Sequence, residues 1–259
     1  MPVLSVDAVS FSYDARIPVL KEVTLGVRRG EFLSLVGPNG SGKTTLLRLL
    51  DRILLPGAGT ITLAGRPLTS YSRAELARRI AFVPQETGTL FPFTVMEVVL
   101  MGRSPHSRGR MFENAGDREV ASRMLRLTDV EHLAAKPVTA LSGGERQRVF
   151  IARALAQEPE IILLDEPNAH LDIAHQMEIF AILRRLNRES GLTVVSVSHD
   201  LNLASSFSDA ITMLLCGAVV ATGSPEAVLT EARIREVFRT SVAVDAHPSA
   251  ASPRITLLP

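Results

Sequence analysis

The chain has 259 residues, and its 28 Lys and Arg residues nearly balance 27 Asp and Glu residues, which leaves a formal net charge of +1. This balance argues against a nucleic-acid-binding protein, because such proteins usually carry a concentrated basic face. Hydrophobic residues make up 46% of the chain, which is enough for a packed core and excludes extensive disorder. The single cysteine, Cys216, excludes an intrachain disulfide and suits a reducing compartment.

The sequence predicts neither a secretory signal nor a membrane span. Its first residues, MPVLSVDAVS, lack the basic region and long apolar run of a signal. The most membrane-like stretch, residues 210–221, contains polar residues and is shorter than the roughly 20 residues that a bilayer helix needs. We therefore expect a soluble, globular and cytosolic protein.

The front of the chain is predicted to form strands and then a helix. Apolar and polar residues alternate over residues 23–28, and residues 32–36 (FLSLV) form a short apolar run. The period then changes, which predicts a helix from near Lys43 to before Pro56. Its apolar face is expected to consist of Leu46, Leu47, Leu49, Leu50 and Ile53.

Further along, strands and helices alternate again. Apolar runs predict strands at 161–165, 193–198 and 210–215, with a short helix after His199. A long helix is expected to follow the first of these strands, with one apolar face made of Ile173, Met177, Phe180, Leu183 and Leu186. This alternation is typical of an α/β fold.

The middle of the chain is different. Residues 87–140 contain no convincing apolar strand, and helical patterns occur at 95–101 and 118–127 around a loop at 102–110 rich in Gly, Pro, Ser and Arg. We interpret this region as a mostly helical insertion into the α/β core. The tail from about residue 241 is expected to be a small edge appendage.

The segment GPNGSGKTT follows the first buried strand and fits G-x-x-x-x-G-K-[ST] at every fixed position. Its glycines allow backbone N–H groups to turn toward phosphate oxygens, and the helix that follows adds its positive end. Lys43 is expected to meet the β- and γ-phosphates, and the Thr44 hydroxyl to bind Mg²⁺. A glycine-rich turn that only connects strand to helix is the plain alternative. The candidate phosphate-binding residues are Gly37, Pro38, Asn39, Gly40, Ser41, Gly42, Lys43, Thr44 and Thr45.

Two carboxylates stand at the end of the predicted strand IILLD, residues 161–165. Asp165 ends this strand, so its side chain is expected at the edge of the sheet where α/β proteins bind ligands, as a ligand of Mg²⁺. Glu166 is a candidate general base for an attacking water. A solvated turn would explain Asp165, Glu166 and Pro167 alone, but the phosphate loop favours the catalytic interpretation.

The segment LSGGERQR, residues 141–148, places a serine and two glycines before a predicted helix, which indicates a second anion-binding helix N-terminus. One chain has little use for two such sites on one triphosphate. This segment resembles the signature motif of ATP-binding cassette (ABC) ATPases, and the resemblance covers nearly the whole chain. Gln85 is similar to the family's Q-loop glutamine, NAHLD at 168–172 to its D-loop, and His199 to its switch histidine.

The resemblance implies the ABC ATPase fold, a P-loop NTPase (RecA-like) core with an antiparallel β subdomain and an inserted helical subdomain. Within one domain, 1–259, the core and β subdomain would take 1–86 and 160–240. The helical signature subdomain would take 87–159, and 241–259 would form the appendage. Tyr13 stands where the family places an aromatic ring on adenine, although packing of an edge-strand aromatic would also explain it.

The resemblance further implies a head-to-tail dimer that holds ATP and Mg²⁺. Ser142, Gly143 and Gly144 would contact the γ-phosphate bound to the other copy, and Asp172 would lie along the dimer seam. Glu166 would activate water, His199 would hold the γ-phosphate and Glu166, and Gln85 would sense Mg²⁺ and water. Thr44, Gln85 and Asp165 would be the metal ligands.

Two departures from the family pattern and several histidines need comment. Glu145 stands where many members have Gln, and Asn168 where Thr is common; neither position carries the chemistry. A metal cluster of His170, Asp172 and His175 is conceivable, but a turn leading into a helix explains these residues better. His106, His132 and His247 are expected at the surface or in loops.

The segment LFPFTVMEVVLMGRSPH, residues 90–106, resembles importers of iron–siderophore complexes, haem and cobalamin. In this family the region near residues 86–106 lines the groove that receives a helix of a separate polytopic permease, so its apolar residues Leu90, Phe91, Phe93, Val95 and Met96 are a candidate docking patch. Packing within the helical subdomain is the alternative.

We therefore predict the ATPase subunit of a metal-chelate importer, with iron–siderophore or haem ahead of cobalamin. It would work at the cytoplasmic face of the inner membrane with a permease and, through it, an extracytoplasmic substrate-binding protein, and would not bind nucleic acid. A soluble ABC ATPase of DNA repair or translation is the second hypothesis, and the separate ATPase of an exporter the third. No long coiled coil interrupts the chain and it holds one cassette, which disfavours the second.

Overall fold

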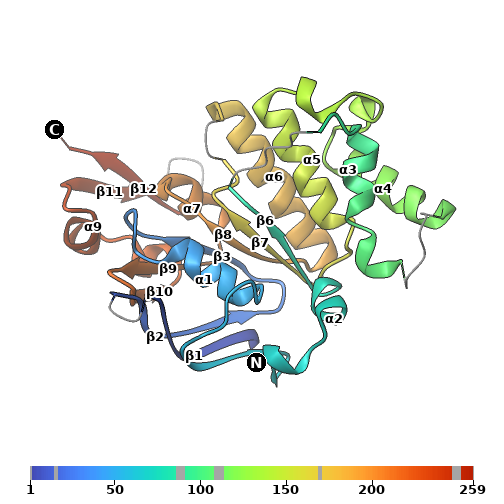
Figure 1. Ribbon diagram of the computed structural model, residues 1–259. Coiled ribbons are helices and arrows are strands. Elements are labelled where there is room, and N and C mark those ends of the chain that lie inside the picture. Colours follow the sequence, from blue (N-terminus) through green and yellow to red (C-terminus); the bar gives the residue numbers. More distant parts are fainter. Residues whose placement is uncertain are drawn as a thin grey trace. The chain divides into compact units, whose positions relative to one another are not determined.

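The computed structural model describes residues 2–14, 17–85, 91–107, 114–168, 171–246 and 252–258 (Figure 1). The chain forms two compact units, of which unit 1 comprises residues 1–70 and 193–259 and unit 2 comprises residues 71–192. Across the described ranges, no helix is long and apolar enough to cross a bilayer. The functional boundaries at 87–159 and 241–259 remain predictions.

Unit 1 contains an antiparallel sheet with the strand order β2-β1-β4-β5. Val23, Leu25 and Val27 of β2 are buried and the residues between them are exposed, which confirms the predicted alternation. The strands are β1 (Pro2–Asp14), β2 (Ile17–Arg28), β4 (Ala58–Leu63) and β5 (Arg66–Pro67).

A second set of strands in unit 1 has the order β10-β9-β3-β8. The central strand β3 pairs in parallel with β8 and β9, and β10 is antiparallel to β9. Every residue of β3 is buried, as the continuous apolar run predicts. The strands are β3 (Phe32–Val36), β8 (Thr193–Val197), β9 (Ala210–Leu215) and β10 (Ala218–Gly223).

Helix α1 (Lys43–Leu50) follows β3 and begins where the sequence predicts. It ends earlier than expected, because Asp51 caps it and Arg52 adopts a left-handed backbone conformation with φ of 55°. Ile53 therefore lies beyond the helix and is 49% exposed, rather than on its apolar face.

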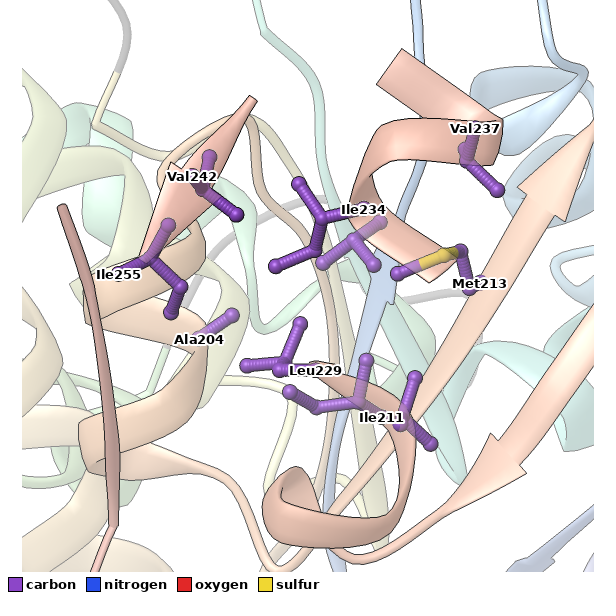
Figure 2. Packing of buried hydrophobic residues seen from close by; sticks show 10 residues of the cluster. Ala204, Ile211, Met213, Leu229, Ile234, Val237, Val242 and Ile255 are labelled. Carbon is purple, nitrogen blue, oxygen red and sulfur yellow. The ribbon is translucent and has the colours of Figure 1, made fainter. Parts of the chain in front are cut away.

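The end of the chain completes the core of unit 1. Strands β11 (Val242–Ala246) and β12 (Pro253–Leu257) form an antiparallel hairpin. Figure 2 shows Val242 and Ile255 of this hairpin in one cluster with side chains of β9 and of helices α7 (Leu201–Phe207), α8 (Pro225–Val228) and α9 (Glu231–Phe238). The buried members are Val36, Ala204, Ile211, Met213, Val228, Leu229, Ile234, Val237, Val242 and Ile255.

Unit 2 contains a parallel strand pair and a group of helices. Strand β6 (Ile80–Val83) pairs with β7 (Ile161–Asp165). Helices α3, α4 and α5 pack against one another, and α6 packs against α5 (Figure 1). The helices are α2 (Arg73–Ala77), α3 (Val95–Met101), α4 (Ala115–Leu127), α5 (Gly143–Leu155) and α6 (Ile173–Ser190).

Helices α3 and α4 confirm the helical patterns predicted at 95–101 and 118–127, with two differences. α4 begins at Ala115 rather than near 118, because the Asn114 side chain accepts the backbone N–H of Asp117 and caps the helix. Residues 104–106 of the expected loop form a 3₁₀ turn, and 108–110 lie outside the described residues.

Helix α6 follows its predicted apolar face only in part. Phe180, Leu183 and Leu186 are buried as expected, but Ile173 is 80% and Met177 46% exposed.

Candidate functional site

The phosphate loop of unit 1 is held tightly between strands. Gly37 and Gly42 have φ of 149° and 101°, values that favour glycine. A Cβ atom on Gly37 would overlap the carbonyl oxygen of Leu214 in β9, and one on Gly42 would lie 2.6 Å from Leu20 Cδ2 in β2. Larger residues at either position would therefore displace the loop from the sheet.

Lys43 places a cation inside this loop. Its side chain is buried, and Nζ donates hydrogen bonds to the carbonyl oxygens of Gly37 (2.8 Å) and Pro38 (3.0 Å). Lys43 is also the first residue of α1, so the positive end of the helix dipole reaches the same place. Thr44 is partly exposed beside it, whereas Thr45 is buried. The loop thus combines the features of an anion-binding site.

Tyr13 and His199 belong to the same unit. A hydrogen bond of 3.3 Å joins the Tyr13 hydroxyl to Thr45 Oγ1, and the ring packs edge-on against Phe11 with centroids 4.9 Å apart. The side chain is nevertheless 58% exposed, so both predicted roles, packing and contact with a base, fit its environment.

His199 is exposed in the turn between β8 and α7. The Ser198 N–H donates to the Leu35 carbonyl (3.1 Å), which puts this turn at the end of β3, the strand that leads into the phosphate loop. The predicted switch histidine and the phosphate loop therefore share one edge of the sheet.

In unit 2, the structure brings three predicted residues together. Val83 pairs with Leu164, so Gln85 lies at the same end of the strand pair as Asp165, the last residue of β7, and Glu166, which follows it. Gln85 Nε2 donates a hydrogen bond of 2.9 Å to Glu166 Oε2. Asp165 is only 3% exposed. Glu166 has φ of 50°, a strained conformation for a residue other than glycine, and such strain is concentrated at functional sites.

The predicted signature serine caps α5. Ser142 Oγ accepts the N–H of Glu145, and Glu145 Oε2 accepts the N–H of Ser142 at 2.8 Å, which completes a capping box. The pKa of Glu145 is lowered, chiefly by the hydrogen bond from the Ser142 backbone and then by the Ser142 side chain. Gly143 and Gly144 form the first turn of this helix.

Asp172 caps α6 in a similar way. Its Oδ1 accepts both the backbone N–H of His175 (2.9 Å) and a hydrogen bond from His175 Nδ1 (2.7 Å). The backbone N–H of His175 is the main cause of the lowered pKa of Asp172, and the His175 side chain is the second. The role of His175 as a partner of Asp172 does not follow from any motif in the sequence, although its three-residue spacing from Asp172 is the available signal. Ala169 and His170 lie outside the described residues.

The candidate docking patch divides into buried and exposed parts. Phe91 is 65% and Phe93 40% exposed, with ring centroids 6.0 Å apart, whereas Val95 is buried. Met96 is partly buried. Residues 86–90, including Leu90, lie outside the described residues. Packing within the helical region therefore explains Val95, whereas docking at the exposed Phe91 and Phe93 stays a prediction.

Several sequence relatives are named as ATP-binding proteins of import systems. A cobalamin import ATP-binding protein of Halobacterium salinarum is 43% identical over 241 residues, which cover 93% of this chain but only 60% of that relative's length. A hemin import ATP-binding protein of Thermobifida fusca is 42% identical over 253 residues, covering 98% of this chain and 88% of the relative. These matches confirm the predicted resemblance to this importer group.

Solved structures with the same fold are ABC transporter chains. One, described as the inward-facing conformation of a transporter assigned to the metal-chelate type, has a TM-score of 0.87 and 31% identity, covering 100% of this chain and 98% of that chain. A dimeric bacterial ABC transporter cassette has a TM-score of 0.75 and 34% identity, covering 85% and 98%. The predicted α/β fold of an ABC ATPase is therefore confirmed. With a family model for ABC transporters matching residues 20–169, this chain belongs to the ABC transporter family.

Proposed function

We propose that the chain is the ATP-hydrolysing subunit of an importer for a metal chelate of the siderophore, haem or cobalamin kind. The observation that carries the hydrolytic part is the hydrogen bond between Gln85 and Glu166 at the end of β6 and β7. In hydrolysis, a water oxygen attacks the γ-phosphorus, Glu166 accepts the water proton, and the bond to the leaving ADP oxygen breaks. His199 would orient the γ-phosphate, and Lys43 would neutralise its charge.

Mg²⁺ is the proposed accompanying ion. Asp165 and Gln85 offer a carboxylate and an amide oxygen, the hard ligands that Mg²⁺ prefers, and Thr44 offers a hydroxyl. When bound, the ion would offset the charge of the phosphates. ATP itself follows from membership of the family; stacking of its adenine on the exposed ring of Tyr13 is part of the proposal.

The proposed partner of this chain in ATP binding is a second copy of itself. Asp172 and the exposed apolar residues Ile173 and Met177 lie next to one another at the start of α6. Exposed apolar groups of this kind mark surfaces that associate. In a head-to-tail dimer, Ser142, Gly143 and Gly144 of one copy would contact ATP held by the phosphate loop of the other.

Glu166→Gln should abolish ATP hydrolysis and trap an ATP-bound dimer, because the amide preserves the shape of the base but cannot accept the proton. Hydrolysis would be measured by phosphate release and dimerisation by size-exclusion chromatography with ATP. Glu189→Gln, an exposed carboxylate at the end of α6, is the matched control and should behave as the wild type. Wild-type turnover in Glu166→Gln would contradict the assignment of the base.

The proposed import role requires a separate permease and an extracytoplasmic binding protein, and places the chain at the cytoplasmic face of the membrane. The names of the relatives and the exposed pair Phe91 and Phe93 support it. The double change of Phe91 and Phe93 to Ser should reduce co-purification with the permease severalfold, because it removes the apolar contact. Leu257→Ser, equally apolar and 74% exposed elsewhere, is the control. Equal loss in both would contradict docking at this pair.

A further inference from the structure

Within unit 2, the first turn of α5 lies directly against the segment that contains Asp172. A Cβ atom on Gly144 would approach the His175 ring to 2.5 Å at Cδ2 and 2.8 Å at Cγ. A Cβ atom on Gly143 would lie 3.3 Å from Leu171 Cδ2. The ring of His175 therefore occupies the space that a side chain at Gly144 would need.

The position of this ring is fixed from the other side. His175 Nδ1 lies 2.7 Å from Asp172 Oδ1, and the same oxygen accepts the backbone N–H of His175. A carboxylate oxygen can only accept, so the proton of this bond resides on Nδ1. The side chain of Gln176 also donates to the Leu171 carbonyl at 2.9 Å, which holds the backbone before Asp172.

A second link joins the two helices. Arg148 Nη1 of α5 lies 2.8 Å from Glu178 Oε2 of α6, and the arginine side chain is only 12% exposed. The helices lie side by side in Figure 1 and are in contact. Helices α5 and α6 are thus connected at two places, once at the signature turn and once further along the helices.

We propose that His175 is a positioning residue that couples Asp172 to the signature glycines, so that both present one preassembled surface to the second copy. The proposal rests on the proposed function, because it assigns the signature turn to ATP in the other chain. The ring transmits position in two ways: its hydrogen bond orients it on Asp172, and its bulk limits where Gly144 can lie. Loss of either should misplace the backbone N–H groups that would meet the γ-phosphate.

Three substitutions separate the two contacts. His175→Phe keeps the ring against Gly144 and loses the hydrogen bond, His175→Asn keeps a donor and loses the ring, and His175→Ala loses both. We expect His175→Ala to lower kcat about tenfold while KM for ATP changes less than about twofold, since the chain's own phosphate loop is untouched. His175→Phe and His175→Asn should each recover part of kcat. His132→Ala, an exposed histidine elsewhere in unit 2, is the control.

A double-mutant cycle tests the contact itself without ATP. Gly144→Ala should lower the unfolding midpoint in the wild type, because its methyl group meets the ring. In the His175→Ala background the same substitution should lower the unfolding midpoint little, because the ring no longer fills the space beside residue 144. Equal losses in both backgrounds, or wild-type kcat in His175→Ala, would overturn the inference. A wild-type chain that hydrolyses no ATP would instead overturn the proposed function, and the unfolding cycle would still decide whether the contact exists.

Discussion

Four helices of unit 2 begin with the same arrangement of side chains, a capping box. Helices α2, α3, α4 and α5 each begin with a polar cap and a carboxylate three residues later that accepts the N–H of the cap. The hydrogen bonds lower the pKa of Glu97 and of Glu145, in both cases chiefly through the backbone N–H of the capping residue. At Ser142 this arrangement also fixes the turn that would meet ATP.

Glu145 should make stability depend on pH at this turn. Its pKa in the folded chain lies below the ordinary value of 4.5, so its stabilising effect is present above that pH and is lost as the pH falls through the folded value. Glu145→Gln keeps an acceptor for the capping box but does not titrate. Urea unfolding from pH 7 downward should therefore show that the wild type loses more stability below pH 4.5 than Glu145→Gln. Glu119→Gln, on the exposed side of α4, should follow the wild type; parallel curves for wild type and Glu145→Gln would contradict the prediction.

Residue types and spacing suffice to predict most of the candidate site, because phosphate binding constrains local sequence. Gly37, Gly42 and Lys43 belong to one loop. The positive φ of the two glycines and the cation of Lys43 are both what a phosphate-binding loop requires. The contact of His175 with Gly144 is different. These residues are far apart in sequence, and only the packing of α6 on α5 brings them together.

At the scale of elements, one buried arginine joins three segments of unit 2. Arg103, just after α3, is 9% exposed. It donates to Asp117 of α4 (3.1 Å), to the Ala156 carbonyl at the end of α5 (2.7 Å) and to Glu158 (2.9 Å). Burial by itself would raise the pKa of Glu158, but the hydrogen bonds and charges of Arg103 and then Arg123 lower it below its ordinary value. The network thus holds the helix that carries Ser142.

Removing the guanidinium of Arg103 should lower the free energy of unfolding substantially. Arg103→Ala removes the ion pair of 3.1 Å with the buried carboxylate of Asp117, and breaking a buried pair of this kind costs about 3–5 kcal/mol of unfolding free energy. The matched control is Arg126→Ala, whose ion pair with Glu131 is about half exposed on both sides and should contribute about 0–1 kcal/mol. Urea denaturation of both variants measures the difference. Similar losses would show that the network does not join the helices as the distances indicate.

The apolar faces of the helices show that sequence periodicity does not predict which apolar residues are buried. The pattern of α6 predicts one apolar face, and its second half is buried, yet Ile173 and Met177 are exposed. Periodicity reports only that a face is apolar and does not reveal what covers it. The end of α1 differs from the predicted end for a related reason, since nothing in the spacing of its leucines reveals that Arg52 turns the backbone.

At the scale of the whole molecule, the chain returns to unit 1 to finish the core behind the phosphate loop. Val36 directly precedes Gly37, and it belongs to the same buried cluster as Val242 and Ile255 of the final hairpin. Figure 2 shows these two hairpin residues in the cluster. Residues from both parts of the chain therefore support the loop. By contrast, Ser142 and Asp172 belong to unit 2, and the proposed dimer assigns them to ATP bound by the other copy.

This division of labour predicts complementation between two inactive variants. Lys43→Ala should disable the phosphate loop of its own chain, and Ser142→Arg should disable the signature turn that serves the other chain. In a head-to-tail dimer of the two, the loop of the Ser142→Arg chain meets the intact signature of the Lys43→Ala chain. An equal mixture should recover roughly a quarter of the wild-type rate per chain, because half of randomly formed dimers are mixed and each holds one intact site. Phosphate release by each variant alone and by the mixture measures this. If loop and signature instead served ATP within one chain, mixing would restore nothing, because every chain would carry one disabled half.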